Sequence, residues 1–204
     1  MIDIDNVLSA APVIPVLVVD DIAHARPLAE ALVAGGLPVI EVTLRTPVAA
    51  EVITEMAKVP GTIVGAGTVV SPGDLSAALV AGAKFVVSPG ITAALGSAAR
   101  TSGVPFLPGV ASASDIIRAA EMGFTRLKFF PAAAAGGLPL LRALAAPFAH
   151  VRFCPTGGIT FETAAEWLAE PGVACVGGSW IARRGETDWA AIEARARAAA
   201  GLRG

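Results

Sequence analysis

The stretch VIEVTLRTPVAAEVITEMAKVPGTIVGAGTV, residues 39–69, contains two predicted strands separated by a predicted helix. Its two ends, VIEVTL and IVGAGTV, are rich in β-branched residues and are typical of strands. The middle, PVAAEVITEMAKV, is amphipathic and has the length of a short helix. Two strands joined by a helix normally lie parallel in one sheet, so the stretch predicts a βαβ unit.

The same unit recurs through the rest of the chain, with strand-like segments beginning about every 20 to 26 residues. Eight such units in 204 residues fit a compact (β/α)8 barrel with short loops, and we expect residues 1–204 to form one domain. The eight predicted strands are VIPVLVV from Val13, VIEVTL from Val39, IVGAGTV from Ile63, FVVSPG from Phe85, PFLPGV from Pro105, RLKFFP from Arg126, VRFCPTGG from Val151 and VACVGGS from Val173.

A doubly wound open sheet is the alternative arrangement of alternating strands and helices. Such a sheet usually has fewer strands and an early glycine-rich GxGxxG turn, whereas VIPVLVVDD, at the first strand, contains no glycine. The (β/α)8, or TIM, barrel is therefore the predicted α/β fold. Before the first strand, the segment from Asp3 to Ala10 predicts a short helix that covers one end of the barrel.

The composition of the chain excludes several classes of protein. Apolar residues make up 54% and charged residues 16%, the net charge is −2, and there is no basic tract, so we expect neither a disordered chain nor a nucleic-acid binder. The start, MIDIDNVLSA, lacks the basic region of a secretory signal, and APVIPVLVV is too short for a membrane span. We expect a cytoplasmic protein that does not contact a membrane.

The cysteines and histidines do not form a metal-binding pattern. Cys154 and Cys175 lie in separate apolar segments without a CxxC pair, and we interpret them as reduced core residues. The chain has two histidines, too few near the cysteines for a zinc site. We expect neither a metal ion nor an organic cofactor.

Alternation along the second predicted strand places polar side chains inside the barrel. Alternate strand residues point into a barrel, and active sites lie at the C-terminal strand ends. In VIEVTLR the apolar side chains share the side that faces the helices, and the inward side carries Glu41, Thr43 and Arg45. Charged groups are unusual in a barrel interior. They either form an internal Glu41–Arg45 ion pair that closes the barrel, or they serve a ligand.

The same alternation turns Lys128 of RLKFFP inward. Of the three lysines in the chain, Lys58 lies at a predicted helix end and Lys84 precedes the fourth strand, so Lys128 alone is expected inside. Burial disfavours the charged ammonium, which favours a nucleophilic amine near neutral pH. The alternative is a lysine that pairs with Glu41 and has no chemical role.

Two glycine-rich turns, CPTGGIT and VGGSW, follow the seventh and eighth predicted strands. Many barrels bind phosphate at this place through backbone N–H groups. Glycine lets an oxyanion approach the backbone closely, and neighbouring hydroxyls add donors. In these two turns, Thr156 and Ser179 would supply the hydroxyl donors.

These groups together predict one kind of chemistry. Lys128 would attack a ketone and form a protonated Schiff base, which is an electron sink for C–C cleavage. Glu41 would shuttle protons, directly or through a water. Arg45 and Thr68 would hold the carboxylate of a 2-oxo acid, and the glycine turns would hold a phosphate at the far end of the substrate.

The chain resembles the bacterial family of 2-keto-3-deoxy-6-phosphogluconate (KDPG) aldolase, also called 4-hydroxy-2-oxoglutarate (KHG) aldolase. The phrases that carry the resemblance, in order from Pro12 to Trp180, are PVIPVLVV, EVTLRT, VGAGTV, SPG, KFFPA, RFCPTGGI and GGSW. The resemblance implies a Schiff-base lyase of the Entner–Doudoroff pathway, normally a homotrimer, that cleaves KDPG into pyruvate and glyceraldehyde 3-phosphate.

The resemblance also assigns roles residue by residue. Lys128 is similar to the Schiff-base lysine and Glu41 to the acid/base of the family. The pyruvate end is matched by Arg45, Thr68 and Pro89, the aromatic beside the imine by Phe130, and the hydroxyl and phosphate end by Thr156, Gly157, Gly158, Gly178 and Ser179.

One segment departs from the family pattern, and two other functions stay open. After KFFPA this chain has Ala133–Ala135, where family members tend to carry acidic and amide residues, which puts the loop or substrate tuning in question. The first alternative function is that of a related aldolase that prefers the galactonate-derived epimer of KDPG, which differs from KDPG at C4. A non-catalytic barrel that binds sugar phosphates is the alternative from another class. The relative activity on KDPG and KHG is left open.

Overall fold

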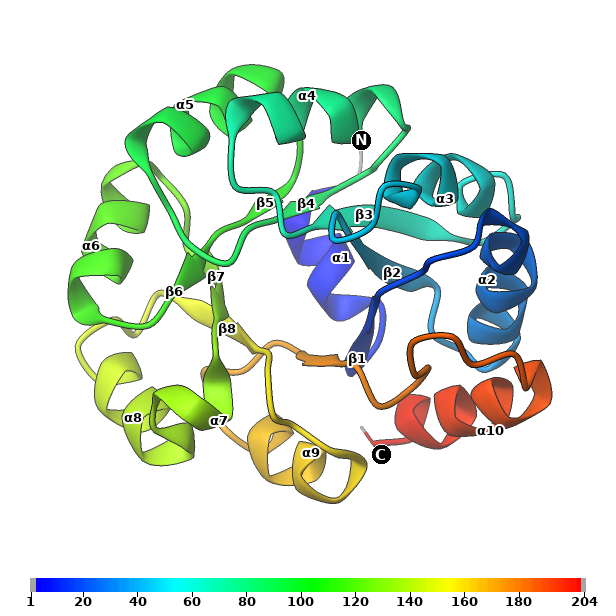
Figure 1. Ribbon diagram of the computed structural model, residues 1–204. Coiled ribbons are helices and arrows are strands. Elements are labelled where there is room, and N and C mark those ends of the chain that lie inside the picture. The colour runs from blue at the N-terminus through cyan, green and yellow to red at the C-terminus, as the bar shows by residue number, and fades with distance from the viewer. Residues whose placement is uncertain (1–2, 203–204) are drawn as a thin grey trace.

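The computed structural model describes residues 3–202, and its parallel strands form a barrel enclosed by helices (Figure 1). Proline carries no N–H for a strand ladder, and Pro108 separates β5 from β6, so these two short strands share one position in the barrel. The strands are β1 (Val13–Leu17), β2 (Val39–Thr43), β3 (Ile63–Gly67), β4 (Val86–Val87), β5 (Phe106–Leu107), β6 (Gly109–Val110), β7 (Arg126–Phe129), β8 (Arg152–Pro155) and β9 (Val176–Gly178).

Strand pairing follows the chain around the barrel. One sheet has the order β5-β4-β3-β2-β1-β9, and the other has the order β6-β7-β8. Isolated parallel bridges from Phe153 to Val173 and from Thr156 to Gly177 connect β8 with β9. All eight predicted strands are present, and the predicted barrel is confirmed.

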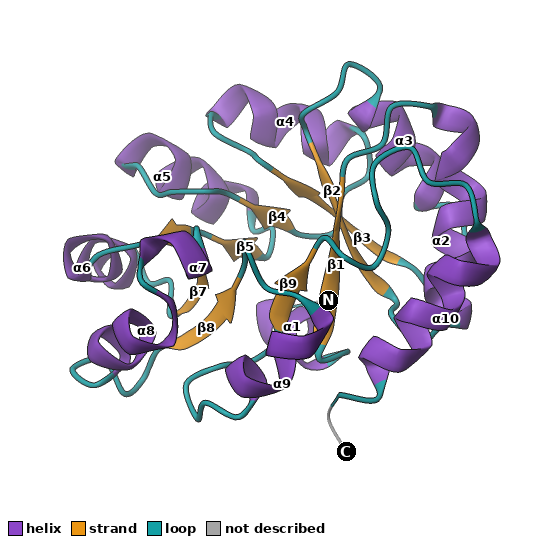
Figure 2. Ribbon diagram, turned by 60° about the horizontal axis from the view of Figure 1, so that its bottom comes forward, coloured by secondary structure: helices purple, strands orange, loops and turns teal. Residues whose placement is uncertain are grey.

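Helices follow the strands and cover their outer side (Figure 2). Ser71, Thr92 and Ser112 begin three of these helices by accepting a hydrogen bond from a backbone N–H of the first turn. The elements are η1 (Ile22–His24), α2 (Ala25–Ala34), α3 (Ala49–Met56), α4 (Pro72–Val80), α5 (Ala93–Ser102), α6 (Ala113–Glu121), α7 (Ala132–Ala135), α8 (Gly137–Ala145), α9 (Phe161–Leu168) and α10 (Trp189–Ala200).

Strand alternation divides the core into two apolar clusters. Ile40 and Val42 belong to the outer cluster, between the strands and the helices. The inner cluster fills the barrel near its N-terminal end and comprises Val7, Leu8, Ile14, Val39, Phe85, Val87, Leu107, Cys154 and Cys175. The predicted core location of both cysteines is confirmed, since Cys154 and Cys175 are buried.

The first helix, α1 (Ile4–Ser9), closes one end of the barrel. It lies inside the ring of outer helices (Figure 1), and its Val7 and Leu8 are buried in the inner cluster. Its Asp5 accepts a hydrogen bond from Nη2 of Arg126 at 3.1 Å, and Arg126 begins β7. Helix α1 therefore covers the N-terminal strand ends, as predicted, and leaves the C-terminal strand ends open for a site.

Among the described residues, 3–202, there is no helix with the length and apolar character needed to cross a membrane.

Removing the Leu8 side chain should destabilise the barrel, because Leu8 is 2% exposed and fills its interior. We expect Leu8→Ala to lower the free energy of unfolding by about 2–5 kcal/mol, measured by urea denaturation. Val80→Ala is the matched control: Val80 is 91% exposed on α4, and the expected change is within about 0.5 kcal/mol. Equal effects of the two substitutions would contradict the role of α1 as part of the core.

Candidate functional site

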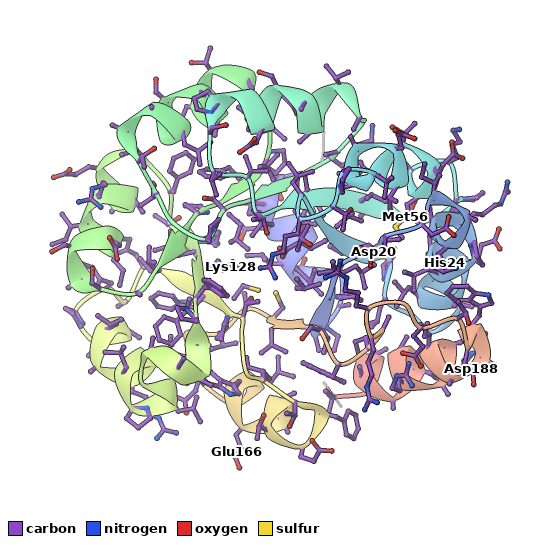
Figure 3. The ribbon with its side chains drawn as sticks, viewed as in Figure 1. Asp20, His24, Met56, Lys128, Glu166 and Asp188 are labelled. Atoms are coloured by element: carbon purple, nitrogen blue, oxygen red, sulfur yellow. The ribbon has the colours of Figure 1, made fainter. Side chains whose placement is uncertain are left out.

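Lys128 and Glu41 form a buried ion pair inside the barrel. The Nζ atom of Lys128 lies 3.2 Å from Oε1 of Glu41, and the two side chains are only 6% and 4% exposed. Lys128 comes from β7 and Glu41 from β2, and three strand positions separate β2 from β7 in either direction around the barrel. The pair therefore spans the interior, and Figure 3 shows Lys128 near the centre of the barrel.

A glycine on the neighbouring strand makes room for the Glu41 carboxylate. A Cβ at Gly67 of β3 would lie 2.1 Å from Oε1 of Glu41, which is far closer than atoms can approach. Gly65, two residues earlier, leaves the same kind of space for the Phe85 ring, which would lie 2.4 Å from a Cβ at that position. The space that the two glycines leave is therefore filled by neighbouring side chains.

Arg45 and Thr68 meet at the C-terminal ends of β2 and β3. Nε of Arg45 donates a hydrogen bond to Oγ1 of Thr68 at 3.2 Å, and Arg45 is exposed. Thr68 has a φ of 60°, in the left-handed region that β-branched residues rarely adopt. Glu41 pairs with Lys128, so the alternative of an internal Glu41–Arg45 pair does not occur. Arg45 and Thr68 are left at the open end as a paired cation and hydroxyl.

Phe130 lies beside Lys128, and Pro89 packs against the neighbouring strand. The ring centroid of Phe130 is 5.3 Å from Nζ of Lys128, within the range of a cation–π contact. Gly109 of β6 is the register partner of Lys128, and a Cβ at Gly109 would lie 2.3 Å from the carbonyl oxygen of Pro89. Pro89 therefore packs directly against the strand next to the lysine.

The two glycine turns lie next to each other at the same end of the barrel. The bridge between Thr156 and Gly177 joins the end of β8 to β9, where Gly178 and Ser179 follow. Gly157 and Gly158 have φ values of 101° and 76°, which L-residues with a side chain rarely adopt. Thr156 is buried, whereas Gly158 and Ser179 are exposed.

The alanine run that departs from the family pattern forms α7 and supports the first of these turns. The backbone N–H groups of Ala132 and Ala133 donate to the carbonyls of Thr156 and Gly157 at 2.8 and 3.0 Å. A Cβ at Gly158 would lie 2.6 Å from the Cβ of Ala133. The sequence left the role of this alanine run open, and the structure shows that the alanines make a helical turn against the glycines.

Three further side chains at the C-terminal strand ends were not singled out by sequence reasoning as site residues. Thr43 is buried, and its hydroxyl donates to the carbonyl of Leu17 at 2.8 Å. Ser88 is buried, and its Oγ accepts from the N–H of Gly90 at 3.3 Å. Trp180 packs so closely that a Cβ at Gly178 would lie 2.4 Å from its ring. The signal available in the sequence for Ser88 was a serine in the SPG turn at the end of a predicted strand.

Within residues 3–202 no group of three or more histidine, cysteine or acidic side chains is arranged to hold a metal ion. The arrangement that is present combines a buried amine and carboxylate, an exposed arginine with a threonine, and two glycine turns.

Comparisons with known proteins show the family of this chain. Residues 4–195 match the family model described as "KDPG and KHG aldolase". The 2-dehydro-3-deoxy-phosphogluconate aldolase of Zymomonas mobilis is 53% identical over 203 residues, covering 100% of this chain and 98% of that protein.

Two solved structures are also similar to this chain. The KDPG aldolase of Zymomonas mobilis ZM4 with 3-phosphoglycerate is 53% identical, with a TM-score of 0.97 and coverage of 98% of this chain and 96% of that chain. The KDPG aldolase of Legionella pneumophila, with pyruvate captured as a covalent carbinolamine intermediate, is 46% identical, with a TM-score of 0.94 and coverage of 98% of both chains. By family model, sequence identity and fold, this chain belongs to the KDPG and KHG aldolase family.

Proposed function

We propose that this chain is a class I aldolase that cleaves KDPG into pyruvate and glyceraldehyde 3-phosphate, and KHG into pyruvate and glyoxylate. The observation that carries the mechanism is the contact between Nζ of Lys128 and Oε1 of Glu41, 3.2 Å apart inside the barrel. An amine beside a carboxylate of this kind can exchange a proton with it and act as a nucleophile.

The reaction begins with transfer of a proton from the Lys128 ammonium to the Glu41 carboxylate. The neutral amine then attacks C2 of the 2-oxo acid and forms a carbinolamine. Glu41 returns its proton to the carbinolamine hydroxyl, which leaves as water, and a protonated Schiff base remains. The positive nitrogen is now conjugated with C2 and can accept an electron pair.

Cleavage follows when the Glu41 carboxylate, directly or through a water, removes the proton of the C4 hydroxyl. The C3–C4 bond breaks, its electron pair moves toward the Schiff-base nitrogen, and the aldehyde product leaves. The remaining enamine takes a proton at C3 from Glu41, and water hydrolyses the Schiff base to release pyruvate and free Lys128.

The two ends of the substrate are held by different groups. Arg45 and Thr68 bind the carboxylate at the pyruvate end, where the guanidinium makes charge-assisted hydrogen bonds. Phe130 and Pro89 pack beside the reacting carbons. The hydroxyl and phosphate end is held by Thr156, Gly157, Gly158, Gly178 and Ser179, through hydroxyls and backbone N–H groups.

The family relatives support this assignment. A covalent carbinolamine with pyruvate, as seen in the Legionella aldolase, is the intermediate that Lys128 would form. A ligand such as 3-phosphoglycerate, present in the Zymomonas aldolase structure, has the carboxylate and phosphate that the two ends of the site would accept. The shared family and the 53% identity over the full chain favour the same reaction here.

Assembly and location are inferred from the family resemblance. We infer a homotrimer, which the high apolar fraction of 54% also favours. We expect sedimentation equilibrium to give three times the 20.4 kDa mass of the chain, and a monomer would contradict this inference. The cytoplasmic location stays a prediction.

Borohydride reduction in the presence of pyruvate should trap the Schiff base on Lys128. We expect peptide mass mapping to find one pyruvate-derived adduct, on the peptide that contains Lys128. Lys84 is exposed at the start of the β4 segment and serves as an internal control that should stay unmodified. An adduct on Lys84 instead, or no adduct, would overturn the mechanism and favour a non-catalytic sugar-phosphate binder.

Replacing Glu41 by glutamine should impair proton transfer far more than binding. We expect Glu41→Gln to slow Schiff-base formation and the exchange of pyruvate methyl protons by about 100-fold or more, because the amide cannot accept the proton. Proton NMR in deuterated water measures the exchange, and pyruvate titration measures affinity. A loss of affinity with unchanged exchange would mean that Glu41 only holds Lys128 in place.

A further inference from the structure

A two-point ion pair joins two loops at the C-terminal end of the barrel. Nε and Nη2 of Arg184 donate to Oδ2 and Oδ1 of Asp20 at 2.7 and 2.6 Å. Asp20 follows β1, and Arg184 follows β9, 164 residues later in the chain. The two strands are neighbours, with Pro15 opposite Gly178. The pair therefore links the loops next to Gly178 and Ser179, the proposed phosphate end of the site.

The segment between Ser179 and Arg184 has a defined position. Ile181 and Ala182 are buried, and the carbonyl of Ile181 accepts a hydrogen bond from Nε of Arg195 at 2.8 Å. Glu186 accepts hydrogen bonds from the N–H of Arg183 at 3.0 Å and from Nη2 of Arg195. These contacts fix the backbone on both sides of Arg184, so its guanidinium is held at a set place relative to Ser179.

Arg184 keeps donors for a further partner. Asp20 accepts hydrogen bonds from Nε and from one N–H of Nη2. Within the described part of the chain, Nη1 makes no hydrogen bond. The side chain is 65% exposed, so a ligand can reach it. The hydrogen bond from Arg184 lowers the pKa of Asp20, which keeps the carboxylate charged and the guanidinium oriented near neutral pH.

The residues assigned to the phosphate end include no cation. Residues 156–158 and 178–179 offer hydroxyls and backbone N–H groups, which carry no formal charge. Lys128 and Arg45 serve the reacting carbon and the carboxylate at the other end of the substrate. A phosphate monoester carries up to two negative charges at neutral pH, and arginine binds such oxyanions through paired N–H donors.

We propose that Arg184, oriented by Asp20, binds the phosphate of the substrate and determines the preference of this chain for phosphorylated over unphosphorylated 2-oxo acids. Figure 3 places Asp20 between Lys128, near the barrel centre, and His24 on the outer side, which fits a ligand that extends from Lys128 toward this loop. The inference rests on the proposed aldolase function and adds a specificity-determining residue to it.

Steady-state kinetics of Arg184→Ala with two substrates test the proposal. We expect KM for KDPG to rise about tenfold or more, since a charge-assisted hydrogen bond to phosphate is lost. KHG carries no phosphate, so its kcat and KM should stay within about twofold. Arg184→Lys keeps the charge but loses the planar fork, and it should give an intermediate KM for KDPG.

Arg183→Ala is the matched control. Arg183 is the neighbouring exposed arginine, and its backbone N–H, not its guanidinium, bonds Glu186. The same net charge is removed, and we expect both substrates to react as in the wild type. If Arg183→Ala and Arg184→Ala raised KM for KDPG equally, the change would come from the loss of positive surface charge in general, and the proposal would be overturned.

Asp20→Ala separates phosphate binding from loop support. This variant breaks the ion pair but keeps the Arg184 cation, so KM for KDPG should rise less than in Arg184→Ala. If both variants impaired KDPG and KHG equally, the pair would only support the loops, and the proposal would be overturned.

Calorimetric titration with 3-phosphoglycerate keeps the test independent of turnover. We expect the wild type to bind 3-phosphoglycerate about tenfold more tightly than Arg184→Ala, and unphosphorylated glycerate equally in both. A wild type that binds the ligand but cleaves neither substrate would overturn the aldolase function and leave the Arg184 assignment supported. Equal affinity of the wild type and Arg184→Ala for 3-phosphoglycerate, or no binding by either, would overturn that assignment.

Discussion

The ion pair between Lys128 and Glu41 is the constraint on which the interior of this barrel depends. Removing two charges from water costs several kcal/mol per ion, and their attraction repays this cost only with close contact, so the pair adds little to stability. Loss of one partner would leave an unpaired buried charge, at a cost of about 3–5 kcal/mol. Gly67 keeps the space that the Glu41 carboxylate needs, and Gly109 lets the Pro89 turn approach the strand beside Lys128. The neighbouring strands thus accommodate the pair that the proposed reaction requires.

Much of the fold and the location of this pair could be predicted from the sequence, because both depend on local periodicity. The alternation of side chains along β2 and β7 turns Glu41 and Lys128 inward and depends only on the local strand conformation. Both residues are buried, as expected. Turn residues and strand spacing in the same way indicate eight βα units. The catalytic roles of Lys128 and Glu41 stay predictions until the Schiff base is trapped.

Other features could not be read from the sequence because they depend on how distant segments meet. The partner of Arg45 is Thr68 and not Glu41, since closure of the barrel brings Lys128 to Glu41 from the opposite side. Thr68 has a left-handed φ, which costs about 1–3 kcal/mol. Because β-branched residues rarely adopt this conformation, the sequence gives no sign of it at this position. Helix α7 is short, and its contacts with Thr156 and Gly157 come from tertiary packing, not from the propensity of four alanines.

Helix α1 closes the N-terminal end of the barrel, so ligands reach the interior from the C-terminal end. Its Val7 and Leu8 fill the N-terminal end, so substrate and both products pass through the same opening. In the proposed reaction, pyruvate stays covalently attached to Lys128 after C–C cleavage, while the aldehyde is free. The aldehyde therefore departs first and pyruvate second. In the reverse, bond-forming direction, pyruvate must first form the enamine on Lys128 before the aldehyde can react with it, so covalent attachment orders the two reactants and both enter through the open end of the barrel.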